Sequence, residues 1–208
     1  MKPLRILITA GPTHEPIDPV RYIGNRSSGR MGAAIAQAAI AAGHQTTLIL
    51  GPVTVAIPTA VQRIDIQSAA DMEAAVLEQF RSHDLLIMAA AVADFRPKLF
   101  SPAKIGRDGS LVIECEPTSD IVAAAAKRKS PNQRVIGFSL ESAGGLERAR
   151  EKLARKGLDM IVYNPIETMN SATVEAVLIY GDGRSETLPV SSKEEFAVLL
   201  ISRVVGLF

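Results

Sequence analysis

The sequence predicts an α/β fold with three layers, α/β/α, in which a Rossmann-like and largely parallel sheet lies between two layers of helices. Short apolar runs alternate with helical patterns through most of the chain, and this order is typical of parallel sheets that are covered on both faces. Near the end of the chain, two apolar runs flank Gly181-Asp182-Gly183. That turn signal predicts a C-terminal antiparallel hairpin at the edge of the sheet.

Length and composition agree with a single domain over residues 1–208, because 47% hydrophobic residues can build a sizeable core. The net charge of +1 and the 4% of aromatic residues argue against a nonspecific nucleic-acid binder. Cys115 is the only cysteine, so we expect neither a disulfide within the chain nor a cysteine zinc site. No apolar stretch approaches the roughly 18 residues of a membrane span, and the N-terminal apolar run is too short for a signal peptide. We therefore expect a cytoplasmic protein without a membrane partner.

The first expected elements are two strands and the helix between them. Residues 4–9 form a short apolar run that Gly11 closes, which predicts a buried strand. Residues 31–42 are rich in alanine and precede Gly43, so we expect a helix that ends there. Residues 46–50 are a second apolar run and a second expected strand.

The later elements follow from caps and from further apolar runs. Ser68 caps a helix that we expect to reach residue 80, with Asp71 in its first turn. Asp120 caps another helix over residues 121–129. The remaining expected strands cover residues 85–89, 111–115, 134–138 and 160–163, the remaining helices cover 146–156 and 193–205, and the terminal hairpin covers 174–179 and 186–190.

The segments that follow the expected strands are the candidates for a functional site, because ligands of open α/β sheets bind outside the carboxyl ends of the strands. These segments are residues 11–32, 90–104, 138–145 and 164–171. Two connections, residues 13–30 and 92–109, are longer than ordinary loops. Such long loops in compact domains are often functional.

The loop before the first helix carries donors for an anion. Gly11 turns the chain after the strand, and Ser28 and Gly29 precede a helix whose N-terminus offers unpaired N–H groups to a phosphate. Arg21 can hold a phosphate or a carboxylate through two parallel hydrogen bonds. Neither a Walker motif nor a Gly-x-Gly-x-x-Gly pattern follows the strand. The alternative interpretation is a capped helix with a structured surface loop.

Residues 11–32 read Gly-Pro-Thr-x-Glu-Pro-x-Asp-Pro-Val-Arg-x-Ile-x-Asn-x-Ser-Ser-Gly-Arg-Met-Gly. This segment resembles the opening of bacterial phosphopantothenoylcysteine synthetases, in which a lysine usually stands at the position of Arg30. The resemblance implies ligation of 4′-phosphopantothenate to cysteine in coenzyme A synthesis, with CTP as co-substrate and Mg²⁺; the choice between CTP and ATP and the metal ligands stay open. In the reaction that the resemblance implies, the carboxylate would first be joined to CMP as an acyl-cytidylate, with release of pyrophosphate, and the amine of cysteine would then displace CMP.

The resemblance also implies roles for residues of this loop. Asn25 would be catalytic in the cysteine step and would contact the substrate, since its amide can both donate and accept a hydrogen bond. Arg21 would hold the phosphopantothenate end. Gly11, Ser28 and Gly29 would contact the nucleotide.

A second matching segment is Ala-Ala-Val-Ala-Asp at residues 90–94. In the family this signature lines the site, so we expect Ala90 and Ala91 at the substrate and Asp94 at the nucleotide or the metal. The alternative is a strand end packed under a helix, in which Asp94 caps the loop.

The next matching segment, Lys104-Ile105-Gly106-Arg107, aligns with the family motif Lys-x-Lys-Lys. Lys104 matches the catalytic lysine of the activation step, where an ammonium can offset charge that develops at the α-phosphate of the nucleotide. Gly106 stands in place of a lysine, which leaves open how strongly this loop binds the nucleotide. A lone exposed lysine is otherwise an ordinary solvated side chain.

The second half of the chain supplies further nucleotide-binding candidates. Asp120 and Ile121 match the end of the family's Asn-Pro-Asp-Ile, and Phe138 matches a strand-ending phenylalanine near the nucleotide. Lys152 and Lys156 lie four residues apart and share one helix face, and lysines at these places meet the triphosphate in the family. The alternative for the two lysines is an ordinary charged surface helix.

Family members with this fold are dimers whose site lies near the subunit boundary, so we expect a homodimer. Many relatives carry an N-terminal flavin-dependent decarboxylase; that half is not in this sequence, so we expect no bound flavin and regard a separate decarboxylase as a candidate partner. Two other functions stay open. A Rossmann-type NAD(P)-dependent enzyme needs an acidic residue for the ribose and a Tyr-x-x-x-Lys-like base, which this sequence does not match. A degenerate nucleotide-binding module without turnover is left open by Gly106.

Overall fold

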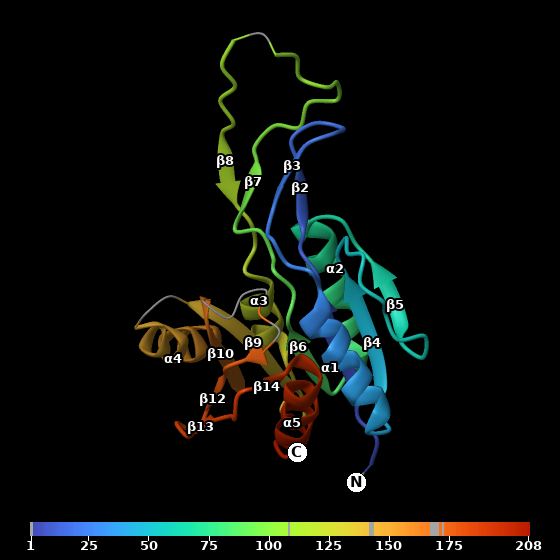
Figure 1. Cartoon of the computed structure of the whole chain (residues 1–208), viewed down its shortest axis with the longest axis vertical. Helices are drawn as coiled ribbons and strands as arrows, with labels where there is room; N and C mark the ends of the chain where they lie inside the picture. Colours follow the sequence, from blue (N-terminus) through green and yellow to red (C-terminus); the bar gives the residue numbers. More distant parts are fainter. Residues whose placement is uncertain (1, 108, 142–143, 167–170, 172) are drawn as a thin grey trace.

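The computed structural model describes residues 2–107, 109–141, 144–166, 171 and 173–208, and its centre is a sheet of eight strands (Figure 1). The strands are β1 (Arg5–Ala10), β4 (Gln45–Leu50), β5 (Gln62–Asp65), β6 (Leu85–Met88), β9 (Arg134–Glu141), β10 (Met160–Pro165), β12 (Val177–Tyr180) and β13 (Ser185–Thr187). Across the sheet they are ordered β13-β12-β10-β9-β6-β1-β4-β5. The strands from β5 to β10 are parallel, and β12 and β13 are antiparallel. This confirms the predicted sheet and its terminal hairpin.

The order in which the chain adds parallel strands to the sheet reverses at β1. This strand pairs with β4 on one side and with β6 on the other. The chain therefore extends the sheet outward to β5, returns to the centre, and then extends it the opposite way through β9 and β10. A crevice forms outside the carboxyl ends of the strands at such a switch point. The expected site thus lies beyond Ala10 and Met88, where β1 and β6 end.

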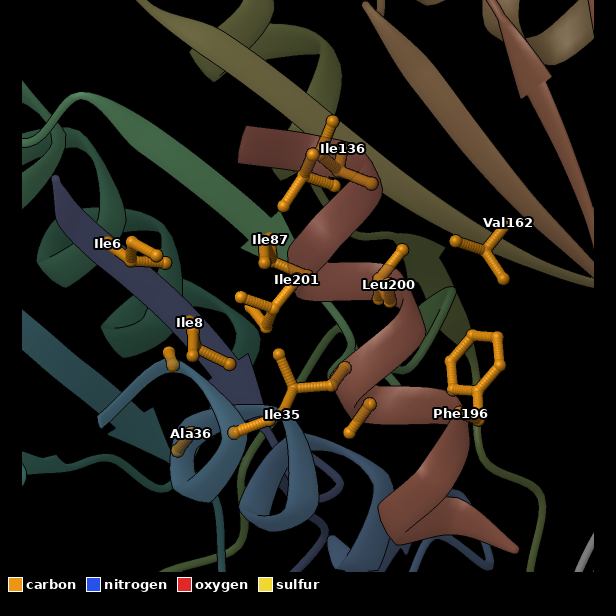
Figure 2. Close-up of a cluster of buried hydrophobic side chains, with 14 of the residues drawn as sticks. Ile6, Ile8, Ile35, Ala36, Ile87, Ile136, Val162, Phe196, Leu200 and Ile201 are labelled. Carbon is orange, nitrogen blue, oxygen red and sulfur yellow. The ribbon is translucent and has the colours of Figure 1, made fainter. Parts of the chain in front are cut away.

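Helices cover both faces of the sheet, as the sequence predicts. One face carries α1 (Arg30–Ala41) and α5 (Lys193–Val205), and the other carries α2 (Ala69–Gln79), α3 (Ile121–Arg128) and α4 (Gly145–Lys156). A short 3-10 turn, η1 (Phe80–Ser82), follows α2. Successive strand residues point to opposite faces: Ile6 and Ile8 pack with α1 and α5 (Figure 2), and Leu7 packs with the other layer.

Four short strands lie outside this sheet and form an extension above it (Figure 1). β2 (His14–Pro16) pairs with β3 (Tyr22–Gly24), and β7 (Phe95–Pro97) pairs with β8 (Cys115–Pro117), both antiparallel. These strands and the loops that join them, residues 14–24 and 95–117, are here called the arm. A further small pair, β11 (Thr173–Val174) with β14 (Ser191–Ser192), precedes α5.

The strand predicted over residues 111–115 is wrong, because this segment belongs to the arm. Residues 111–114 are irregular, and only Cys115 belongs to a strand, β8. The apolar run was the reason for the prediction, but Leu111 and Val112 are 49% and 82% exposed on the arm. Hydrophobicity at these positions therefore does not mark a buried sheet strand.

A buried carboxylate links the two halves of the arm. Asp18 accepts hydrogen bonds from the backbone N–H groups of Val20 at 2.9 Å, Arg21 at 2.8 Å and Ile105 at 3.1 Å, and its carboxylate pairs with the Arg21 guanidinium. Arg21 in turn donates to the carbonyl oxygen of Ile105 at 2.8 Å. The hydrogen bond from the Arg21 side chain is the main reason that the pKa of Asp18 lies well below its usual range. The hairpin and the long loop of the arm are thus joined by ionic hydrogen bonds.

At the base of the arm, the ends of β1 and β6 are joined by backbone hydrogen bonds. The N–H of Thr13 donates to Ala91 at 3.2 Å, and the N–H of Ala91 donates to Gly11 at 2.9 Å. The N–H of Ala93 donates to the Thr13 hydroxyl at 3.0 Å, across 80 positions of sequence. The two excursions that make the arm therefore leave the sheet from one shared base.

Other elements differ from the predictions in smaller ways. β5 was not expected, because three of its four residues are polar and it forms the edge of the sheet. The hairpin strands are β12 and β13, shorter than residues 174–179 and 186–190, and Gly183 takes a φ of 91° in the turn between them. Within the described part of the chain, no helix has the length and apolar character that crossing a bilayer requires.

Candidate active site

A cleft of about 1180 Å³ opens at the carboxyl edge of the sheet, where the switch point predicts a ligand. Its walls come from the loop before α1, the segment after β6, the start of α3, the end of β9 and one face of α4. A volume of this size exceeds that of a typical small-molecule pocket. The cleft can therefore hold a nucleotide together with a second substrate.

Three glycines bring the start of α1 against the end of β1. Gly11 and Gly29 both have positive φ, 80° and 77°, and a Cβ on either one would lie 2.8 Å from Cγ1 of Val53. A Cβ on Gly32 would lie only 2.3 Å from Cβ of Ala10. Gly11, Gly29 and Gly32 pack the loop and the helix closely, although the β2–β3 excursion separates the first glycine from the other two in the sequence. The glycines are therefore not contiguous in the sequence, yet the start of α1 lines the cleft with its unpaired N–H groups.

Asn25 lies in the cleft with its amide orientation fixed. Its Nδ2 donates to the carbonyl oxygens of Ala91 at 3.2 Å and Val92 at 3.0 Å. No side chain or backbone group in the described part of the chain donates to its Oδ1. The segment after β6 thus holds the donor half of the amide and leaves the acceptor half for a ligand.

The two lysines of α4 both line the cleft, and each is paired with a carboxylate. Lys152 pairs with Glu141, which also accepts from Ser139 at 3.1 Å and from Arg148 at 3.1 Å. The hydrogen bond from Lys152 is the main cause of the lowered pKa of Glu141, and its attraction to the same ammonium adds to it. Lys156 pairs with Asp120 at 3.0 Å. Both lysines must exchange a carboxylate for a phosphate if they are to bind a triphosphate.

Asp120 also begins α3. Its Oδ1 accepts from the N–H of Ala123 at 3.2 Å, as the N-cap of the helix that the sequence predicts. The carboxylate therefore has a structural function that does not depend on a ligand. Asp120 and Ile121 both line the cleft.

Positive charge predominates in the lining of the cleft. Among the described residues, five cationic side chains line it, against the two carboxylates of Asp94 and Asp120; the cations are Arg26, Arg30, Lys152, Lys156 and Lys193. A cleft with walls of one sign concentrates ligands of the opposite sign. The lining therefore favours a polyanion, such as a triphosphate.

The structure brings most of the predicted site residues together and leaves three outside the cleft lining. Those that line it are Asn25, Ser28, Gly29, Ala90, Ala91, Asp94, Asp120, Ile121, Phe138, Lys152 and Lys156. Gly11 lies directly beneath Gly29, with its Cα 3.5 Å from a Cβ built there. Arg21 and Lys104 belong to the arm, where Arg21 is bonded to Asp18 and Lys104 is exposed. Within one chain the predicted residues thus form two groups.

Lys193 and Asn164 line the cleft but were not among the predicted site residues. Asn164 is buried at the end of β10, and its Nδ2 donates to the carbonyl oxygen of Glu175 at 2.7 Å. Lys193 is the first residue of α5. The sequence signal for Lys193 is its position at the start of a predicted helix. Helices that run antiparallel to the strands begin near the carboxyl edge of the sheet, where the cleft lies. The expected segment 164–171 includes residues 167–170, and the expected segment 138–145 includes residues 142–143; both stretches lie outside the described residues.

Comparison with known proteins identifies the chain. The family of the DNA/pantothenate metabolism flavoprotein C-terminal domain matches residues 1–207. The chain belongs to this family. Membership confirms the resemblance to phosphopantothenoylcysteine synthetases that the sequence motifs indicate.

Two curated relatives and one crystal structure illustrate the similarity. The coenzyme A biosynthesis bifunctional protein CoaBC of Escherichia coli (strain K12) is 42% identical over 213 residues, which cover 99% of this chain and 52% of that protein. A cysteine/cysteine sulfinic acid decarboxylase of an unknown prokaryotic organism is 44% identical over 215 residues, which cover 99% of this chain and 60% of that protein. The chain thus spans between half and two thirds of the length of these relatives. The crystal structure of the C-terminal domain of a CoaBC protein is 37% identical, with a TM-score of 0.86, and the match covers 98% of this chain and 95% of that one.

The fold also argues against the alternative of a Rossmann-type NAD(P)-dependent enzyme. Dinucleotide-binding folds place an acidic residue for the ribose about twenty residues after the glycine turn. Here that position, at the end of β4, reads Leu50-Gly51-Pro52 and contains no acid. A Cβ on Gly51 would lie 1.8 Å from the carbonyl oxygen of Pro12, so the backbone itself fills this place. The geometry therefore argues against a nicotinamide cofactor.

Proposed function

We propose that this chain is a phosphopantothenate–cysteine ligase that activates the 4′-phosphopantothenate carboxylate with CTP and Mg²⁺ and then joins it to cysteine. The single observation that supports it most is the fixed amide of Asn25 in the cleft, beside the start of α1 and among the five cations that the described residues contribute to its lining. The family membership supports the same activity, since relatives of this chain are the CoaBC proteins of coenzyme A biosynthesis. CTP and 4′-phosphopantothenate are both anions, which agrees with the positive charge of the cleft lining.

The first step forms a mixed anhydride. A carboxylate oxygen of phosphopantothenate attacks the α-phosphorus of CTP, the bond from that phosphorus to the bridging oxygen breaks, and pyrophosphate leaves with the bonding electrons. Charge spreads over the phosphate oxygens during this transfer, so positioned cations stabilise it. The N–H groups at the start of α1 and the ammonium groups of Lys152 and Lys156, which line the cleft, would stabilise this charge.

The second step uses the anhydride as an acylating agent. The amine of cysteine attacks the acyl carbon, CMP leaves, and the amine loses a proton as the amide forms. Oδ1 of Asn25 is the acceptor available to orient the amine, because Nδ2 is already bonded to Ala91 and Val92. Orientation of this kind converts a bimolecular reaction into an effectively unimolecular one.

Mg²⁺ would enter with the triphosphate. No group of three or more His, Cys, Asp or Glu residues that could hold a metal exists in the described part of the chain. This agrees with the usual mode of Mg²⁺ binding, in which substrate phosphates and water supply most ligands and the protein adds one or two carboxylates. Asp94 lines the cleft and would supply such a carboxylate. The ion would neutralise charge on the phosphates.

Arg21 and Lys104 fit the proposal only through a second copy of the chain. Both lie on the arm, outside the cleft lining of their own chain. The arm also exposes several large apolar side chains, including Tyr22, Phe95 and Leu99 at 52%, 55% and 85%. A homodimer in which the arm meets its partner would cover these side chains and could bring Lys104 to a nucleotide.

The decisive experiment follows pyrophosphate release. The purified chain is mixed with phosphopantothenate, cysteine, Mg²⁺ and either CTP or ATP. We expect release that depends on phosphopantothenate, with formation of the amide product. Absence of release with both nucleotides, while either one binds, would replace the ligase by a nucleotide-binding module without turnover.

Two variants separate the steps. Asn25→Asp places a carboxylate 3.0 to 3.2 Å from two carbonyl oxygens, where it cannot donate, so we expect the cysteine step to slow by about a hundredfold or more and the acyl-nucleotide to accumulate. Lys104→Gln should slow pyrophosphate release itself. Asn132→Asp and Lys127→Gln, at exposed positions outside the cleft, are the matched controls. Unchanged kinetics in both test variants would remove these residues from the mechanism.

A further inference from the structure

Part of the cleft is lined by the first residues of two neighbouring helices, α1 and α5. The two helices pack side by side on one face of the sheet (Figure 2). Arg30 begins α1 and Lys193 begins α5, and both side chains line the cleft. They are here called the α1–α5 corner.

Neither cation of the corner has a carboxylate partner within the described part of the chain. The ion pairs of the cleft join Lys152 to Glu141 and Lys156 to Asp120, and none includes Arg30 or Lys193. The bond that Lys193 does make is to the backbone carbonyl oxygen of Ser171. The positive charge of the α4 wall is thus neutralised in the absence of a ligand, whereas that of the corner is not.

The surroundings of Lys193 are unfavourable for its charge. Its side chain is partly buried, and this loss of solvent lowers its pKa; the nearby Arg30 guanidinium lowers the pKa further, while Glu194 opposes the shift. The positive ends of two helix dipoles add to the same field. Placing two cations near each other costs free energy that Glu194 offsets only in part, and an anion that binds between them recovers it.

We propose that Arg30 and Lys193 form a phosphate-binding corner of the cleft, opposite the two lysines of α4. This rests on the proposed function, because the anion is a phosphate group of one of its substrates. A phosphate offers several acceptor oxygens, so it can accept from the Lys193 ammonium, the Arg30 guanidinium and the free N–H groups at the start of α1 together. The corner then explains why a lysine with no carboxylate partner begins α5.

The test measures binding rather than turnover. Isothermal titration with inorganic tripolyphosphate, CTP, cytidine and phosphopantothenate is performed on the full chain and on Lys193→Gln. Glutamine can still donate to the Ser171 carbonyl but carries no charge, so it separates the charge of Lys193 from its contact with the loop. We expect Lys193→Gln to bind tripolyphosphate at least about tenfold more weakly, because one charge-assisted hydrogen bond is lost. The binding of cytidine, which has no phosphate, should not change. The affinity of Lys193→Arg for tripolyphosphate should lie within about threefold of that of the unmodified chain. Arg30→Gln should lose about as much affinity for tripolyphosphate as Lys193→Gln.

The exposed Lys127→Gln is the matched control, because it removes the same charge from α3 outside the cleft. A loss for CTP alone assigns the nucleotide phosphates to the corner, and a loss for phosphopantothenate alone assigns the phosphate of that substrate; both support the corner. Equal binding of all anions by Lys193→Gln and the unmodified chain overturns it. So does a loss that is equal for cytidine and tripolyphosphate, which would mean that Lys193 only holds the loop. If pyrophosphate release fails but tripolyphosphate binding still depends on Lys193, the proposed ligase is wrong and the corner stands.

Discussion

Replacing Gly32 by alanine tests whether the contact between β1 and α1 sets the geometry of the cleft. The new Cβ would lie 2.3 Å from Cβ of Ala10 and 3.0 Å from its Cα, and these neighbours belong to the central strand of the sheet. Reaching an ordinary contact of 3.4 Å requires the helix to move by 1.1 Å, the difference between the two distances. Overpacking of this kind costs about 1–3 kcal/mol, and alanine recovers up to about 1 kcal/mol through its helix propensity.

A displacement of 1.1 Å corresponds to the upper part of that cost, about 2–3 kcal/mol, so the net loss in the free energy of unfolding is about 1–2 kcal/mol. This loss should lower the melting temperature by about 2–8 °C for a chain of this length. Circular dichroism during a thermal scan measures it, and nucleotide titration measures the accompanying loss of affinity as Gly29 and Arg30 move with the helix. Gly206→Ala is the control, because its φ of −68° suits any residue and its nearest neighbour lies at 3.3 Å at the end of the chain. Equal melting temperatures for the two variants would show that α1 is not held by this contact.

Two further changes test charges of the arm and the cleft. Glu141→Gln removes the carboxylate that neutralises Lys152, so CTP should bind several-fold more tightly in a titration; weaker binding would mean instead that Glu141 holds Lys152 in its binding position. Asp18→Asn removes the carboxylate that accepts from Ile105 and Arg21, so the Ile105 amide should exchange hydrogen faster than in the unmodified chain at pH 6. Because the pKa of Asp18 is lowered by folding, its contribution is complete above the unfolded value of about 3.9 and is lost as the pH falls below it. The difference in exchange between the two proteins should therefore shrink below about pH 4, and a constant difference would contradict the assignment.

The regular part of the fold could be predicted from the sequence because its signals are local. Apolar runs such as residues 46–50 and caps such as Ser68 lie within the elements that they define, and the structure contains β4 and α2 there. β5 gave no such signal, since an edge strand can be polar. The apolar run at residues 111–113 gave a misleading signal, because these exposed residues of the arm are as hydrophobic as the residues of a buried strand.

The candidate site was predictable where it follows strands and not where it depends on charges that meet in space. Asn25, Ala91 and Asp94 belong to motifs next to β1 and β6, and the structure brings them together. The pairing of Lys152 with Glu141 could not be foreseen, because many charged residues of α4 could have been its alternative partners. Lys193 lies far along the chain, and only the packing of α5 on α1 brings it to the cleft.

The shared base of the arm has a mechanical consequence. Thr13, Ala91 and Ala93 bond the two outgoing stems to each other, and Asn25 bonds to the same segment where the first excursion returns. If another protein bound the apolar side chains at the tip of the arm and displaced it, both stems would move together about their shared base. The Asn25 amide would move with them. The arm can therefore be shortened or exchanged between relatives only as a complete unit, since cutting back one excursion would strip hydrogen-bond partners from the other.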